Sequence, residues 1–130
     1  MSLRALFALQ ALLLLVIGIL YVFGLTYYLF WRLWWFDIVL HTMGGLWVVL
    51  ATGWLMLRYS VPPRILPLLG VLICISVAWE FFELLTGFRR EDNYAFDTGL
   101  DLVMDLIGGA VGYLLISFQK PKESNATIAQ

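Results

Sequence analysis

Charged residues and cysteines are scarce in this chain. Only 13% of its 130 residues are Asp, Glu, Lys or Arg, against roughly a quarter in soluble domains. The single cysteine, Cys74, excludes a disulfide framework and a cysteine-based metal site. The net charge is −1, and no basic patch indicates binding to nucleic acid.

Hydrophobic residues, in contrast, make up 62% of the chain, and the mean hydropathy is +0.90. Four apolar runs, at about residues 6–28, 35–57, 65–85 and 100–118, approach the ~20 residues that span a hydrocarbon core of ~30 Å. The first run has no small-residue cleavage pattern, which favours a transmembrane helix over a signal peptide. Because the runs are continuous and not alternating, they predict an all-α, integral membrane four-helix bundle.

The spacing of these runs predicts the organisation of the chain. Residues 1–118 form one transmembrane domain, and residues 119–130 form a polar, disordered C-terminal tail. With four spans, both termini share a side with the 58–64 connection. That side carries Arg4, Arg58, Arg64, Lys120 and Lys122, against Arg32, Arg89 and Arg90 opposite. The positive-inside rule therefore predicts both termini in the cytoplasm. Aromatic residues are enriched at membrane interfaces, so we expect an aromatic belt at the outer interface, formed by Trp31, Trp34, Trp35 and Phe36.

Ionisable side chains lie within or at the mouths of three spans. The second and fourth spans begin on the side where the third ends, so the topology gathers these side chains in one leaflet, predicted to be the outer one. Intramembrane groups of this kind are costly and mark functional sites by default. The set is Asp37, His41, Glu80, Glu83, Asp97, Asp101 and Asp105.

Helical spacing turns these groups towards one another. Asp37 and His41 are four residues apart and share a helix face, as do the aspartates at 97, 101 and 105. Glycines follow deeper in both spans, at spacings that let helix backbones approach closely. They are Gly44, Gly45, Gly108, Gly109 and Gly112. We therefore expect the polar faces to point inward above glycine-mediated packing.

Several carboxylates in one intramembrane pocket must be balanced by protons or by a metal ion. One imidazole with several carboxylates suits a divalent cation: Mg²⁺, Mn²⁺, Ca²⁺, Fe²⁺ or Zn²⁺, whose identity the sequence leaves open. The predicted ligands are Asp37, His41, Glu80, Glu83, Asp101 and Asp105. Asp97 is expected to be the N-cap of the fourth helix.

The leading functional hypothesis is metal-assisted hydrolysis or transfer on a phosphate-bearing lipid, either a phospholipid or a polyprenyl phosphate. Glu80 or Glu83 is the candidate general base, and Arg89 and Arg90 are candidates to hold the headgroup. No protein nucleophile stands out, which favours water. The bilayer is the expected environment, and the oligomeric state, a homo-oligomer included, is left open.

Two other classes of function stay open. Carboxylate ladders also serve proton- or cation-coupled transporters and lipid-carrier flippases, although the inner halves of these spans hold no ionisable residue. Alternatively, the polar groups form a non-catalytic network that fixes helix packing. Whether the protein is an enzyme therefore stays open at this point.

Three motifs together resemble a known family. They are Asp37-x₃-His41-x₂-Gly44-Gly45, the run Trp79-Glu80-Phe81-Phe82-Glu83, and the ladder Asp97-Thr98…Asp101…Asp105…Gly109. In this combination, over about residues 35–115, the chain resembles the YjdF-type bacterial inner-membrane proteins and, more loosely, the VanZ-like family. The resemblance implies a multi-pass protein of the bacterial inner membrane.

Overall fold

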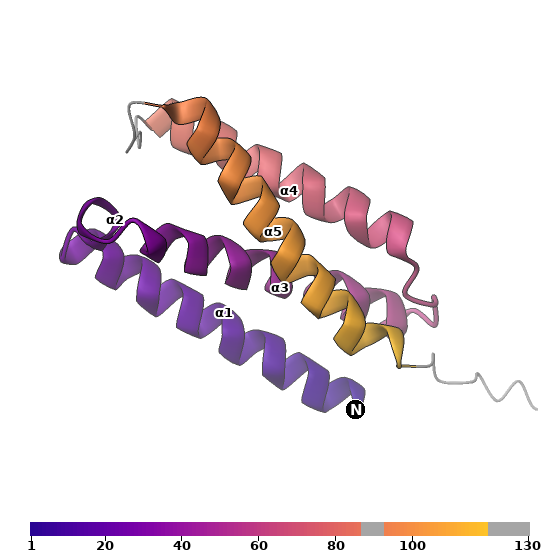
Figure 1. Ribbon diagram of the computed structural model, residues 1–130. Helices are drawn as coiled ribbons and strands as arrows, with labels where there is room; N and C mark the ends of the chain where they lie inside the picture. The colour runs from indigo at the N-terminus through magenta and orange to yellow at the C-terminus, as the bar shows by residue number, and fades with distance from the viewer. Residues whose placement is uncertain (87–92, 120–130) are drawn as a thin grey trace, which may run out of the picture.

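The chain folds into long helices in a computed structural model that describes residues 1–86 and 93–119. The helices are α1 (Leu3–Thr26), α2 (Leu29–Arg32), α3 (Trp35–Arg58), α4 (Ile65–Thr86) and α5 (Tyr94–Ser117), and no strand occurs in these two ranges (Figure 1). All except the single-turn α2 are long and apolar enough to cross a membrane. The prediction of an all-α membrane protein with four spans is therefore confirmed.

Helix α5 begins earlier than hydropathy predicts. Its N-cap is Asn93, whose side-chain oxygen accepts a hydrogen bond from the backbone N–H of Phe96. Asparagine is among the best N-caps because its side chain satisfies an otherwise unpaired helix N–H. Asp97 lies inside the first turn, so the prediction that Asp97 caps this helix is wrong. The first turns of α5 are therefore helical although they precede the apolar run.

Both ends of the described chain meet at one end of the bundle, here called the N-terminal end. The amino group of Met1 donates a 2.8 Å hydrogen bond to Oε1 of Gln119, and the Trp54 indole N–H donates to the carbonyl of Leu3 at 3.1 Å. An even number of membrane spans places both termini on the same side of the membrane, as this contact requires. Which side of the membrane this end faces stays a prediction, and the predicted tail beyond Gln119 lies outside the described residues.

The opposite end, here called the α2 end, is rich in aromatic side chains. Trp31, Trp34 and Trp35 are exposed there, as side chains of an interfacial belt would be. Phe36 differs, because it is buried against Phe30 with ring centroids 5.0 Å apart. Assigning Phe36 to the exposed belt was therefore wrong: it packs inward and helps to hold α2 against α3.

Helices α3 and α5 form the closest pair in the bundle, and glycines make their approach close. A methyl group added at Gly45 would overlap the backbone carbonyl of Asp105, and one added at Gly108 would overlap the carbonyl of Thr42. Without a hydrophobic force between helices in lipid, such small-residue contacts supply the van der Waals packing that associates them. The pair forms a spine on which α1 and α4 pack separately: α1 on α3, and α4 on both (Figure 1).

Candidate metal centre

All six predicted metal ligands are buried between α3, α4 and α5, in the half of the bundle towards the α2 end. His41 and Glu80 each lie six residues inside their helix from that end, and Asp101 lies seven inside α5. At 1.5 Å per residue these positions are about 9–10 Å below the helix ends. Asp105, eleven residues inside α5, is about 16 Å deep. The six residues are 2–8% exposed: Asp37, His41, Glu80, Glu83, Asp101 and Asp105.

The imidazole of His41 lies among three aspartates. Its Nδ1 is 3.4 Å from Oδ1 of Asp105, and its Nε2 is 3.8 Å from Oδ2 of Asp101 and 3.9 Å from Oδ1 of Asp37. A carboxylate beside one ring nitrogen orients the ring and directs the other nitrogen to a metal. Asp105 is therefore placed to orient His41, whereas Asp101 lies beside the nitrogen that is left for coordination.

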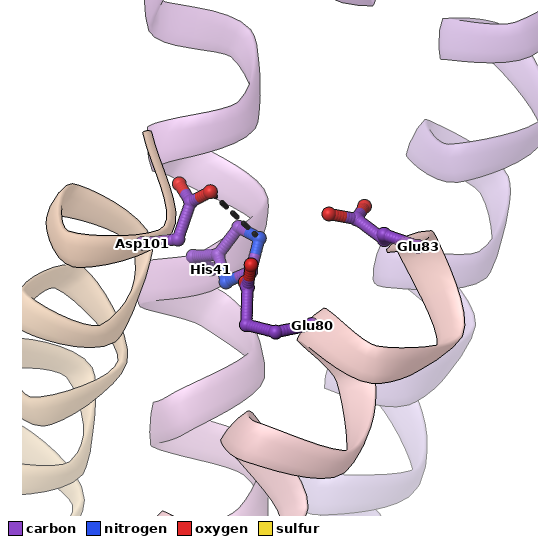
Figure 2. A group of neighbouring side chains, drawn as sticks. All are labelled: His41, Glu80, Glu83 and Asp101. Carbon is purple, nitrogen blue, oxygen red and sulfur yellow. Dashed lines mark ion pairs between the residues drawn. The ribbon is translucent and has the colours of Figure 1, made fainter. Parts of the chain in front are cut away.

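Four of the predicted ligands converge closely enough to share one ion. His41, Glu80, Glu83 and Asp101 each offer a donor atom, and these four atoms all lie within 4.8 Å of one another. Figure 2 shows His41 facing Asp101, with Glu80 and Glu83 reaching from α4 towards them. Donors on one ion with bonds of roughly 2.0–2.6 Å lie at most roughly 4–5 Å apart. The spacing therefore fits a single coordination sphere.

A second set of carboxylates adjoins the first. Asp37, Asp97 and Asp101 also place one oxygen each within 4.8 Å of one another, and Asp101 belongs to both sets. Asp97, in the first turn of α5, is the most exposed of the three. The acidic groups thus run from the mouth to the four-residue set without a break.

Glu80 is held by two side chains of α5. The Thr98 hydroxyl donates a 2.7 Å hydrogen bond to Oε2 of Glu80, and the Tyr94 hydroxyl donates to the Glu80 backbone carbonyl at 3.2 Å. Oε1 of Glu80 and Oδ2 of Asp101 are buried and make no hydrogen bond to any described residue. Such oxygens are costly in a low-dielectric interior unless a cation or a proton satisfies them. Hard donors with unsatisfied oxygens are what a divalent ion requires.

An apolar cavity of about 300 Å³ ends at these groups. It lies between α1, α3 and α4 and is lined mainly by aliphatic and aromatic side chains, among them Leu14, Ile17, Tyr21, Ile75 and Trp79. Its polar lining consists of Asp37, His41, Ser76, Glu83 and Asp105. Glu83 faces the cavity, whereas Glu80 is not part of its wall, so the two predicted bases occupy different positions.

Thr98 was not among the predicted site residues, because its side chain is not ionisable. Its signal was available, because Thr98, Asp101 and Asp105 follow an i, i+3, i+7 spacing on one face of α5. The cavity residues on α1 had no such signal, since the stretch that holds them, residues 14–21, consists of aliphatic residues, one glycine and one tyrosine. Arg89 and Arg90, predicted to hold a headgroup, lie outside the described residues.

Residues 2–122 match the family described as "Predicted membrane protein (DUF2238)". The chain belongs to this family. The match is consistent with the YjdF-type resemblance, while the looser likeness to VanZ-like proteins and a bacterial inner-membrane location stay predictions. No curated protein and no solved structure matches the chain.

Proposed function

We propose that this protein binds a divalent metal ion at His41, Glu80, Glu83 and Asp101 and uses it to hydrolyse, or to transfer, the phosphate group of a membrane lipid. The observation that carries the proposal is the convergence of four buried donor atoms from three helices within 4.8 Å of one another. Packing alone does not require three carboxylates and an imidazole to meet in this way. In lipid, small residues supply close packing at lower cost, as Gly45 and Gly108 do here.

The nature of the donors limits the choice of ion and chemistry. Three carboxylates with one imidazole suit Mg²⁺, Mn²⁺, Ca²⁺, Fe²⁺ or Zn²⁺. When bound, such an ion polarises a phosphoryl oxygen and lowers the pKa of coordinated water. The phosphate-bearing lipid, a phospholipid or a polyprenyl phosphate, is favoured over a water-soluble ester because the site opens into an apolar cavity within the spans.

The two glutamates support different roles. Glu80 accepts from Thr98 and is thereby oriented as a ligand. Glu83 offers one oxygen to the four-residue set and also lines the cavity, so its other oxygen is placed to accept a proton from water there. In hydrolysis the water oxygen attacks phosphorus and the bond from phosphorus to the leaving oxygen breaks. The water proton passes to Glu83, which then gives it to the leaving oxygen, so that the lipid alcohol and inorganic phosphate are released.

Metal binding is tested first. Wild-type protein in detergent micelles, stripped with a chelator, is titrated with Mn²⁺ and the bound ion is followed by electron paramagnetic resonance. We expect about one strongly bound ion per chain at the four-residue set, and a loss of affinity for Asp101→Asn that exceeds the 10–100-fold typical of outer-shell partners. Equal affinity in wild type and Asp101→Asn would overturn the metal centre. Glu123→Gln, a carboxylate far along the sequence from the set, is the control.

Catalysis is tested separately. Phosphatidic acid and a polyprenyl phosphate are offered in mixed micelles with Mn²⁺ or Mg²⁺, and released phosphate is measured. We expect turnover of one of these lipids by wild type and Glu123→Gln, and none by Asp101→Asn or Glu83→Gln. Bound metal without phosphate release from either lipid would reject the hydrolytic function and leave a metal-stabilised membrane protein.

A further inference from the structure

We infer that the apolar cavity beside the metal centre holds one hydrocarbon chain of a membrane lipid, which enters sideways from the bilayer between α1 and α4. The inference rests on the proposed function only for the chemistry at the lipid headgroup. Binding of the hydrocarbon chain depends on the cavity itself, whether or not an ion is bound.

The bundle is open between α1 and α4. No Cα atom of α1 lies within 8 Å of one in α4, and both helices are described along their full lengths. Across the gap, the rings of Tyr21 and Trp79 meet edge to face, with centroids 5.9 Å apart. Both helices are candidate membrane spans, so an opening between them faces hydrocarbon and not water.

Exposure changes from one side of the cavity to the other. The lining residues Leu14, Ile75 and Trp79 are 47%, 45% and 38% exposed, whereas His41 and Ser76 are each only 6% exposed. The cavity is therefore open on its apolar side and closed on its polar side. A lipid matches this arrangement, because its hydrocarbon chain would extend through the open apolar side to the bilayer and its polar headgroup would lie at the buried polar groups.

The dimensions of the cavity select a slender occupant. Its wall on α3 runs from Asp37 to Val48, which is about 16 Å along the helix. A volume of about 300 Å³ spread over that length makes the cavity long and narrow. A helix with its side chains is about 10–12 Å across, so an extended chain suits the cavity better than a helix of a second copy. An extended hydrocarbon chain is the occupant with the right width and polarity.

Gly18 allows the cavity to be filled without disturbing the fold. It lines the cavity, and a Cβ built on it meets no other atom within 4 Å. Leucine at this position adds a large side chain at the edge of the cavity and should narrow the space that the lipid chain occupies. Gly70 in α4 is the matched control, because its Cβ also meets nothing within 4 Å and it is not part of the cavity wall.

The test uses phosphatidic acid that carries a diazirine in the middle of one acyl chain, in nanodiscs of phosphatidylcholine. After irradiation, labelled peptides are mapped by mass spectrometry. We expect labelling at Ile17, Tyr21, Ile75 and Trp79 to exceed labelling on the outward face of α1, at Ile19 and Val22. Gly18→Leu should reduce the cavity labelling at least fivefold, and Gly70→Leu should leave it unchanged.

Several results would overturn this inference. They are equal labelling of the two faces of α1, unchanged cavity labelling in Gly18→Leu, and an unlabelled cavity in a dimer that Gly18→Leu dissociates. The last result would assign the cavity to a second copy. Mn²⁺ affinity of the same samples is measured in parallel. Cavity labelling without Mn²⁺ binding would reject the metal centre alone, and Mn²⁺ binding without cavity labelling would reject this inference alone.

Discussion

Gly45 of α3 lies directly against the backbone of Asp105 in α5, so that a methyl group at Gly45 would overlap the Asp105 carbonyl. Asp105 is also the residue whose carboxylate lies 3.4 Å from Nδ1 of His41. Helix packing and the geometry of the candidate centre therefore meet at one residue. A change that separates α3 from α5 at this point moves His41 and Asp105 apart.

Gly45→Ala should consequently destabilise the protein and weaken metal binding together. Overpacking of a tight contact costs about 1–3 kcal/mol, and here the obstacle is backbone that cannot rotate away. Thermal unfolding in detergent and Mn²⁺ titration measure the two effects. Gly70→Ala is the control, since its new methyl group meets nothing and alanine favours helix over glycine by about 0.5–1 kcal/mol. Unchanged unfolding of Gly45→Ala would mean that the two helices do not approach this closely.

Asp105→Asn should weaken Mn²⁺ binding by about 10–100-fold, the usual effect of losing the carboxylate that orients a metal-bound histidine. The reason is that Asp105 lies beside Nδ1 of His41, and the asparagine keeps the shape but removes the charge. Asp101→Asn should be more severe, because Asp101 belongs to the four-residue set. Titration of both variants gives the order, and an Asp105→Asn effect as large as that of Asp101→Asn would make Asp105 a ligand, as the sequence first predicted.

The two aspartates show which part of the site the sequence could predict. The four-residue spacing of Asp101 and Asp105 places both on one face of α5, and topology brings that face to the half of the bundle that holds His41. Spacing does not say how far α5 is rotated or how deep it lies against α3. The close contacts of Gly45 and Gly108 determine this rotation and depth. Only the structure therefore shows that Asp105 lies beside Nδ1 of His41 and Asp101 beside Nε2.

The helix boundaries show the same limit in the fold. Length and hydropathy predicted four spans because a continuous apolar run has few alternatives in a bilayer. The start of α5 was missed, since Asn93 caps it through a side-chain hydrogen bond, which hydropathy does not detect. The burial of Phe36 was missed for a related reason: an aromatic residue near a helix start suits an interface or a core equally well.

Thr98→Val should reduce Mn²⁺ affinity by roughly 10–100-fold. Hydrogen bonds to charged groups contribute about 1.5–3 kcal/mol, and the valine leaves Oε2 of Glu80 without its donor at 2.7 Å. Thr98→Ser retains the hydroxyl group and should bind Mn²⁺ nearly as wild type does. An equal loss of Mn²⁺ affinity in Thr98→Ser and Thr98→Val would indicate that the methyl group of Thr98 matters for packing. It would also mean that the hydrogen bond to Glu80 does not contribute to metal binding.

Removal of the metal should lower the stability of the wild-type protein reversibly. A ligand that binds only the folded state stabilises it by about 2.7 kcal/mol at a concentration of one hundred times its Kd, which for a chain of this size is a shift in Tm on the order of 10 °C. Excess chelator should therefore lower the Tm, and added Mn²⁺ should restore it. Asp101→Asn should have the same Tm with chelator as with Mn²⁺, because an ion that does not bind the folded protein cannot stabilise it. If chelator shifts Asp101→Asn as much as wild type, the stabilising ion is bound elsewhere; if it shifts neither, the buried carboxylates are balanced by protons and serve as a packing network.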